Sequence, residues 1–83
     1  MFVIKATYKN IDSGAEVTTY IGKVMKERVF TLQNRSMSFS PELVIGYKSL
    51  SVCRKAAYRF FLAAADEAYK IGFTISVNPM EVK

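Results

Sequence analysis

The sequence predicts an α+β fold, a small antiparallel sheet of three to five strands with one long helix packed on one face. Residues 2–9 and 16–21 alternate apolar and polar side chains on either side of a turn. Residues 49–71 contain neither glycine nor proline, and a further alternation follows at 73–77. Because 83 residues leave room for one hydrophobic core, we expect a single α+β domain spanning residues 1–83.

An N-terminal β-hairpin is predicted by the first alternation. The apolar residues of the first strand stand at every second position, Phe2, Ile4, Ala6 and Tyr8. Residues 10–14 are rich in turn formers, and Gly14 can adopt the positive φ angle of a tight reversal. Val17, Thr19 and Ile21 then alternate with polar or aromatic neighbours, which predicts a second antiparallel strand.

The segment between the hairpin and the helix gives weaker signals. The β-branched and aromatic residues favour a third strand at 28–33. Residues 34–41 are either a loop anchored by Met37 and Phe39 or an irregular edge strand, since a proline at the end argues against a central strand. A further short strand is predicted at 43–47.

A long helix is predicted over residues 49–71, which are rich in alanine. Either Ser49 or Ser51 can cap its first turn through the hydroxyl group, and Gly72 stands where a helix C-cap belongs. The alternation that begins at Phe73 then predicts a last strand, which we expect Pro79 to stop.

The helix divides into faces when its residues are placed 100° apart. The core face comprises Leu50, Cys53, Ala57, Phe60, Phe61, Ala64, Ala68 and Ile71. The opposite, charged face comprises Lys55, Arg59, Asp66 and Lys70. We therefore expect the helix to pack its apolar face on the sheet.

A second apolar line, which we call the helix flank, consists of Tyr58, Leu62, Ala65 and Tyr69. Two interpretations are open. In one, these side chains lie at the edge of the core, covered by the 34–47 segment. In the other, they form an exposed ridge beside a basic rim made of Arg54, Lys55 and Arg59, and such a ridge is typical of an interface.

Composition narrows the class of protein. Twelve Lys and Arg against seven Asp and Glu give a formal charge of +5, which favours acidic partners. The single cysteine, Cys53, excludes a disulfide scaffold, and no export signal or membrane-length apolar run is visible. We therefore expect a cytoplasmic protein without membrane contact.

Little in the sequence points to catalysis. Histidine is absent, which removes the commonest general base and most zinc sites. Cys53 falls on the core face of the helix, the acidic residues are scattered, and the four glycines form no phosphate-binding loop. We therefore predict no catalytic residues, no metal site and no cofactor.

The leading hypothesis is a non-enzymatic binding protein, an inhibitor or regulator of the kind found among small accessory proteins of phages and mobile elements. It would bind a protein with an acidic surface through Tyr58, Leu62 and Tyr69, with the basic rim at the margin, and a homodimer is one arrangement open to it. The alternative is a weakly sequence-specific DNA- or RNA-binding protein. Its phosphate contacts would come from Lys23, Lys26, Arg28, Lys55 and Arg59.

Overall fold

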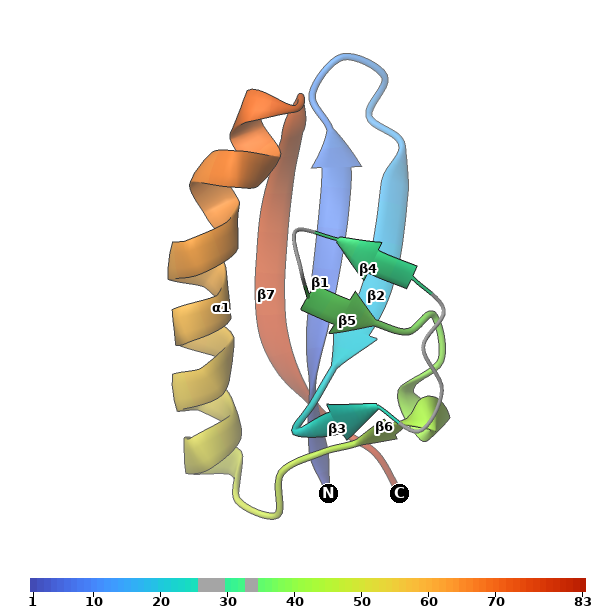
Figure 1. The fold of residues 1–83 in the computed structure, drawn as a ribbon, viewed down its shortest axis with the longest axis vertical. Coiled ribbons are helices and arrows are strands. Elements are labelled where there is room, and N and C mark those ends of the chain that lie inside the picture. Colours follow the sequence, from blue (N-terminus) through green and yellow to red (C-terminus); the bar gives the residue numbers. More distant parts are fainter. Residues whose placement is uncertain (26–29, 33–34) are drawn as a thin grey trace.

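The computed structural model describes residues 1–25, 30–32 and 35–83, and it has the predicted α+β architecture (Figure 1). The main sheet consists of β1 (Phe2–Asn10), β2 (Glu16–Ile21) and β7 (Phe73–Glu81). All pairings in this sheet are antiparallel, and the strand order is β2-β1-β7, so the first strand is central. The helix α1 (Leu50–Lys70) packs on one face of this sheet, mainly against β7.

Two further strand pairs lie between β2 and α1 in the chain. The first joins β3 (Val24–Met25) to β6 (Val44–Ile45), and the second joins β4 (Phe30–Leu32) to β5 (Arg35–Met37). A short 3-10 turn, η1 (Pro41–Leu43), precedes β6.

Most strand predictions for the middle segment agree with these pairs. β4 falls within the predicted strand 28–33, although residues 28, 29 and 33 lie outside the described residues. β6 falls within the predicted strand 43–47. The prediction for residues 34–41 is met by both of its descriptions over the described residues 35–41, because β5 is a short strand and Ser38 then pairs with β2. Residue 34 lies outside the described residues.

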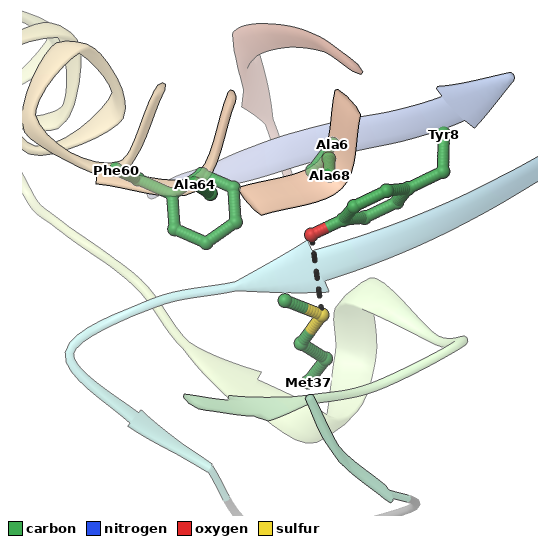
Figure 2. Close-up of a cluster of buried hydrophobic side chains, with 6 residues drawn as sticks. All are labelled: Ala6, Tyr8, Met37, Phe60, Ala64 and Ala68. Atoms are coloured by element: carbon green, nitrogen blue, oxygen red, sulfur yellow. Dashed lines mark hydrogen bonds between the residues drawn. The ribbon is translucent and has the colours of Figure 1, made fainter. Parts of the chain in front are cut away.

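α1 and the β4–β5 pair cover the same face of the main sheet. Figure 2 shows Phe60, Ala64 and Ala68 of α1 meeting Ala6 and Tyr8 of β1. Met37 closes the cluster from the other side, since the buried Tyr8 hydroxyl donates a hydrogen bond to its sulfur over 3.9 Å. The core therefore lies between the sheet and two covering elements, with the helix on the β7 side and β5 on the β2 side.

The ends of α1 are defined by local chemistry. Ser49 is the N-cap, because its hydroxyl oxygen accepts a hydrogen bond from the amide of Val52 at 3.5 Å. Ser51 bonds to the Ser49 hydroxyl instead, at 2.9 Å. At the other end, Ile71 is the C-cap and Gly72 follows with a φ of 91°, a left-handed conformation that glycine adopts without strain.

The prediction that Pro79 stops the last strand is wrong, since β7 continues to Glu81. Val82 donates to the Met1 carbonyl at 2.8 Å and Ile11 donates to the Gly72 carbonyl at 2.9 Å. Because partners alternate along an antiparallel pair, the even-numbered residues of β7 bond to β1 and the odd-numbered ones face outward. The nitrogen of Pro79 therefore faces away from β1, where no donor is needed.

Candidate interaction surface

The helix flank is exposed. The side chains of Tyr58, Leu62 and Tyr69 are 64%, 58% and 67% exposed, while Ala65 between them is half-buried. Their spacing of four, three and four residues places them along one side of α1, so they form a continuous apolar and aromatic ridge. The interpretation in which the 34–47 segment covers them is therefore wrong.

The path of that segment explains why the flank is open. Ser38 exchanges backbone hydrogen bonds with Tyr20 at the outer edge of β2, at 2.7 and 3.1 Å. Met37 is buried against Tyr8, on the far side of the core from the helix flank. Over its described residues 35–47 the segment is thus attached to β2 and does not cover the outward sides of α1 and β7. Phe39, expected as a second anchor beside Met37, is 55% exposed and is not buried in the core.

Two residues assigned to the core face of the helix belong to the surface instead. Phe61 is 39% exposed and Ile71, the C-cap residue, is 57% exposed. The buried residues of α1 are Cys53, Ala57, Phe60, Ala64 and Ala68. This stripe is narrower than predicted because α1 packs mainly against β7, an edge strand of the described sheet, so no further strand of that sheet lies beyond it to cover Phe61.

The basic rim lies along the same exposed part of α1. Arg54, Lys55 and Arg59 are all exposed, within the first three turns of the helix. Asp66 is exposed as well, one turn before Tyr69. The exposed surface of α1 is therefore basic toward its N-terminus and mixed in charge toward its C-terminus, where Asp66, Glu67 and Lys70 are exposed.

Two shallow grooves run between α1 and β7. The first groove, of about 520 Å³, is lined by Arg54, Ala57, Tyr58, Phe61, Ile75, Ser76, Val77 and Pro79. The second groove, of about 250 Å³, is lined by Phe61, Ala65, Asp66, Tyr69, Phe73, Thr74 and Ile75. Phe61 and Ile75 line both, so the grooves meet at these two residues. No pattern in the sequence predicts these grooves, because they form between elements that only the tertiary fold brings together.

The outer edge of β7 borders both grooves. The backbone N–H and C=O groups of Phe73, Ile75 and Val77 point away from β1, because only the even-numbered residues of β7 bond to β1. Within residues 1–25, 30–32 and 35–83, β1 is the only strand that pairs with β7. A proline within an alternating strand is itself a sign of an edge strand, and this signal at Pro79 was available from the sequence.

The residues of the nucleic-acid hypothesis are only partly described. Lys23 is exposed and lines a groove of about 490 Å³ with Lys48 and Val52, beside the first turn of α1. Lys55 and Arg59 are exposed on the following turns of α1. Lys26 and Arg28 lie outside the described residues, so the structure does not test whether the five residues of this hypothesis share one surface.

The remaining chemistry is sparse in the part of the chain that the structure describes. Cys53 is fully buried, and this burial raises the pKa of its thiol. No group of three or more cysteine, aspartate or glutamate residues among the described positions could hold a metal ion. Across the same positions, no helix combines the length and the apolar character needed to cross a membrane.

Comparison with known proteins identified no relative of this chain. The chain matches no protein family, no curated protein and no solved structure.

Proposed function

We propose that this protein is a non-enzymatic binding protein, and that it regulates or inhibits a protein partner by docking through the helix flank and the basic rim. The observation that carries the proposal is the exposure of three large side chains, Tyr58, Leu62 and Tyr69, in one line on a helix. An exposed apolar line of this length on a small domain is typical of an interface rather than of a solvated surface.

The chemistry of the surface supports a protein partner. Tyrosine buries a large area at a low cost in side-chain entropy and retains a hydroxyl for hydrogen bonding, which is why it is common in binding hot spots. Arg54, Lys55 and Arg59 place positive charge along the N-terminal half of this apolar line. Together with the net charge of +5, they favour a partner whose contact surface is acidic at its margin.

Site-specific photo-crosslinking in cells that naturally express the protein tests the proposal. A photoreactive amino acid replaces Leu62, at the middle of the helix flank, and in a matched control it replaces Ile11, which is 49% exposed in the hairpin turn. We expect discrete crosslinks to protein from position 62 and not from position 11. Crosslinks to nucleic acid alone, or an equal pattern from both positions, would refute the proposal.

A double variant then tests which side chains anchor the partner. Tyr58→Ala with Tyr69→Ala should abolish the crosslinks from position 62, because both anchors are lost. Since both side chains are more than half exposed, the free energy of unfolding should change by less than about 0.5 kcal/mol. The paired control, Ile11→Ala with Val17→Ala, removes exposed apolar groups elsewhere and should leave the crosslinks intact.

A further inference from the structure

We propose that the partner contributes an extended segment, which pairs antiparallel with the outer edge of β7 as an additional strand of the main sheet and carries a carboxylate toward Arg54. The inference rests on the proposed function, because it states how a protein partner occupies the grooves beside the helix flank. The partner is then recognised through its backbone and through alternate side chains, a mode of binding known as β-strand addition.

The outer edge of β7 is open and uncharged. Among the described residues only β1 pairs with β7, so the other side of β7 forms the edge of the sheet, alongside α1 (Figure 1). From Phe73 to Asn78 the strand contains no charged residue, and charged residues are a common means of blocking such an edge. The edge of β2 differs, because Ser38 exchanges backbone hydrogen bonds with Tyr20 there. Of these two edges, β7 is therefore the one suited to strand addition.

Three residues of β7 supply the backbone contacts. The outward N–H and C=O groups of Phe73, Ile75 and Val77 allow about six hydrogen bonds to an added antiparallel strand. Pro79 is the next outward residue and has no N–H group, so the ladder loses a donor there. We therefore expect the segment to pair with residues 73–77 and its ladder to end at Pro79.

The two grooves receive alternate side chains of the segment. Residues that lie opposite each other in an antiparallel pair project from the same face of the sheet. Phe73, Ile75 and Val77 pack against the core beneath α1, so the segment residues opposite them also project toward α1. The first groove, of about 520 Å³, then receives the side chain opposite Val77, and the second, of about 250 Å³, receives the one opposite Phe73. The first position therefore favours a larger apolar residue than the second.

An extended segment also uses the exposed aromatic residues of α1. Tyr58 lines the first groove and Tyr69 lines the second, and both side chains are more than half exposed. A strand placed about 4.8 Å from β7 brings no covering element of its own, so it fits beside α1 and packs its side chains against both rings. A helix docked on the helix flank would cover the tyrosines but leave the outward N–H and C=O groups of β7 unpaired.

The charges at the two ends of the surface fix the chemistry of the segment. Arg54 lines the first groove together with Pro79, whereas Asp66 lines the second groove. A carboxylate on the segment is therefore favoured near Pro79 and disfavoured near Asp66. In an antiparallel pair the end beside Pro79 is the N-terminal end of the segment. The segment thus begins with an acidic residue and continues with an apolar residue at every second position.

Selection from random peptides of about ten residues, displayed on phage, tests this chemistry. We expect the enriched peptides to carry Asp or Glu near the N-terminal end, followed by apolar residues at alternate positions. Selection on the Arg54→Glu variant should enrich Lys or Arg at the acidic position instead. The absence of enriched peptides would overturn the proposal. Apolar residues at the helical spacing of three and four, or an acidic residue only at the C-terminal end, would overturn it as well.

Backbone methylation of one enriched peptide tests the hydrogen bonds. Each apolar residue of the peptide lies opposite an outward residue of β7 and donates its N–H to it. Methylation of that nitrogen should weaken binding at least about tenfold, because it removes a donor and separates the strands. Methylation of the residues in between, whose N–H groups point to solvent, should change binding little. Fluorescence anisotropy measures both, and equal effects at the two kinds of position would contradict strand addition.

A matched pair of variants at Ile75 tests the same bonds from the protein side. Ile75→Ala and Ile75→Pro both shorten the side chain, but only proline removes the outward N–H group. This group does not bond to β1, so the β1–β7 ladder tolerates proline at position 75 as it does at Pro79. Ile75→Pro should bind the peptide at least about tenfold more weakly than Ile75→Ala. Equal affinities of the two folded variants would overturn the proposal, and if Ile75→Pro does not fold, the methylated peptides decide.

The outcomes separate this inference from the proposed function. Crosslinks from position 62 to a protein, combined with no enriched peptide or with insensitivity to methylation, would support the proposed function and overturn strand addition. Absence of both peptide binding and protein crosslinks would refute the two together.

Discussion

Gly46 lies against the backbone carbonyl of Phe2, so closely that a Cβ at position 46 would overlap the oxygen and come within 3.0 Å of a methyl group of Val3. The contact is fixed by the next residue, since Tyr47 and Phe2 exchange two backbone hydrogen bonds of 2.7 Å each. Glycine is therefore required at position 46 for space rather than for an unusual φ angle.

Gly46→Ala should lower the free energy of unfolding by about 1–3 kcal/mol or more, the range expected when an extra methyl group is forced into a packed site. Urea unfolding followed by circular dichroism measures the change. Gly14 provides the comparison, because its φ is 75° and a Cβ there would meet no atom within 4 Å. Gly14→Asn should be nearly neutral, since asparagine tolerates this conformation; equal losses at both positions would contradict the steric explanation.

The adjacent residues Phe60 and Phe61 should differ sharply in their effect on stability. Phe60 is 7% exposed and packs in the core cluster of Figure 2, whereas Phe61 lies at the meeting point of the two grooves. Phe60→Ala should cost about 3–5 kcal/mol. Phe61→Ala should cost less than half as much in thermal or urea unfolding of the monomer, and a similar loss for both would show that position 61 belongs to the core.

The two serines before the helix offer another matched pair. Ser49→Ala removes the oxygen that accepts from the Val52 amide and should destabilise the protein by about 1 kcal/mol. Ser51→Ala removes only the bond between the two hydroxyl groups and should cost less. The comparison requires only urea unfolding curves, and a larger effect at position 51 would reassign the cap.

Stability should fall in alkaline solution because of two groups near the start of α1. Burial raises the pKa of the Cys53 thiol. Burial is also the larger cause of the raised pKa of Tyr47, and the negative charge of the Cys53 thiolate is the smaller one. Burial favours the protonated form of each group, because that form is neutral. At pH values between the unfolded-state and folded-state pKa, the folded protein therefore binds more protons than the unfolded protein. The free energy of unfolding therefore decreases as the pH rises above roughly 8.5, the ordinary pKa of a thiol.

The measurement for this effect is urea unfolding between pH 7 and pH 10. Cys53→Ala removes the thiol and the charge that acts on Tyr47, so its stability should vary less with pH than that of the wild-type protein. An unchanged slope in the variant would assign the pH dependence to other groups.

The elements with strong local signals were predictable from the sequence. The hairpin of β1 and β2 follows from the alternation around Gly14, and α1 follows from an uninterrupted run between a serine and Gly72. The choice between Ser49 and Ser51 as N-cap was left open, because both have the right chemistry and only the geometry of the first turn distinguishes them.

The features that depend on tertiary arrangement were not predictable in the same way. Whether the helix flank is covered depends on the path of residues 34–47, and Ser38 attaches that path to β2 rather than to α1. Phe61 and Ile71 were assigned to the core because a helical projection shows direction but not the width of the covering sheet. Pro79 was taken as a stop because its outward position is known only once the pairing with β1 is known.

The placement of β1 between β2 and β7 also has a consequence for folding kinetics. The β1–β7 pair joins Phe2 to Glu81 and Asn10 to Phe73, so the sheet is completed by contacts between the most distant parts of the sequence. During synthesis the hairpin can form early, but one side of β1 stays without a partner until residues 73–81 have left the ribosome. Loop closure over this distance slows folding, and in that interval the unpaired side of the nascent strand is available to aggregation or to a chaperone.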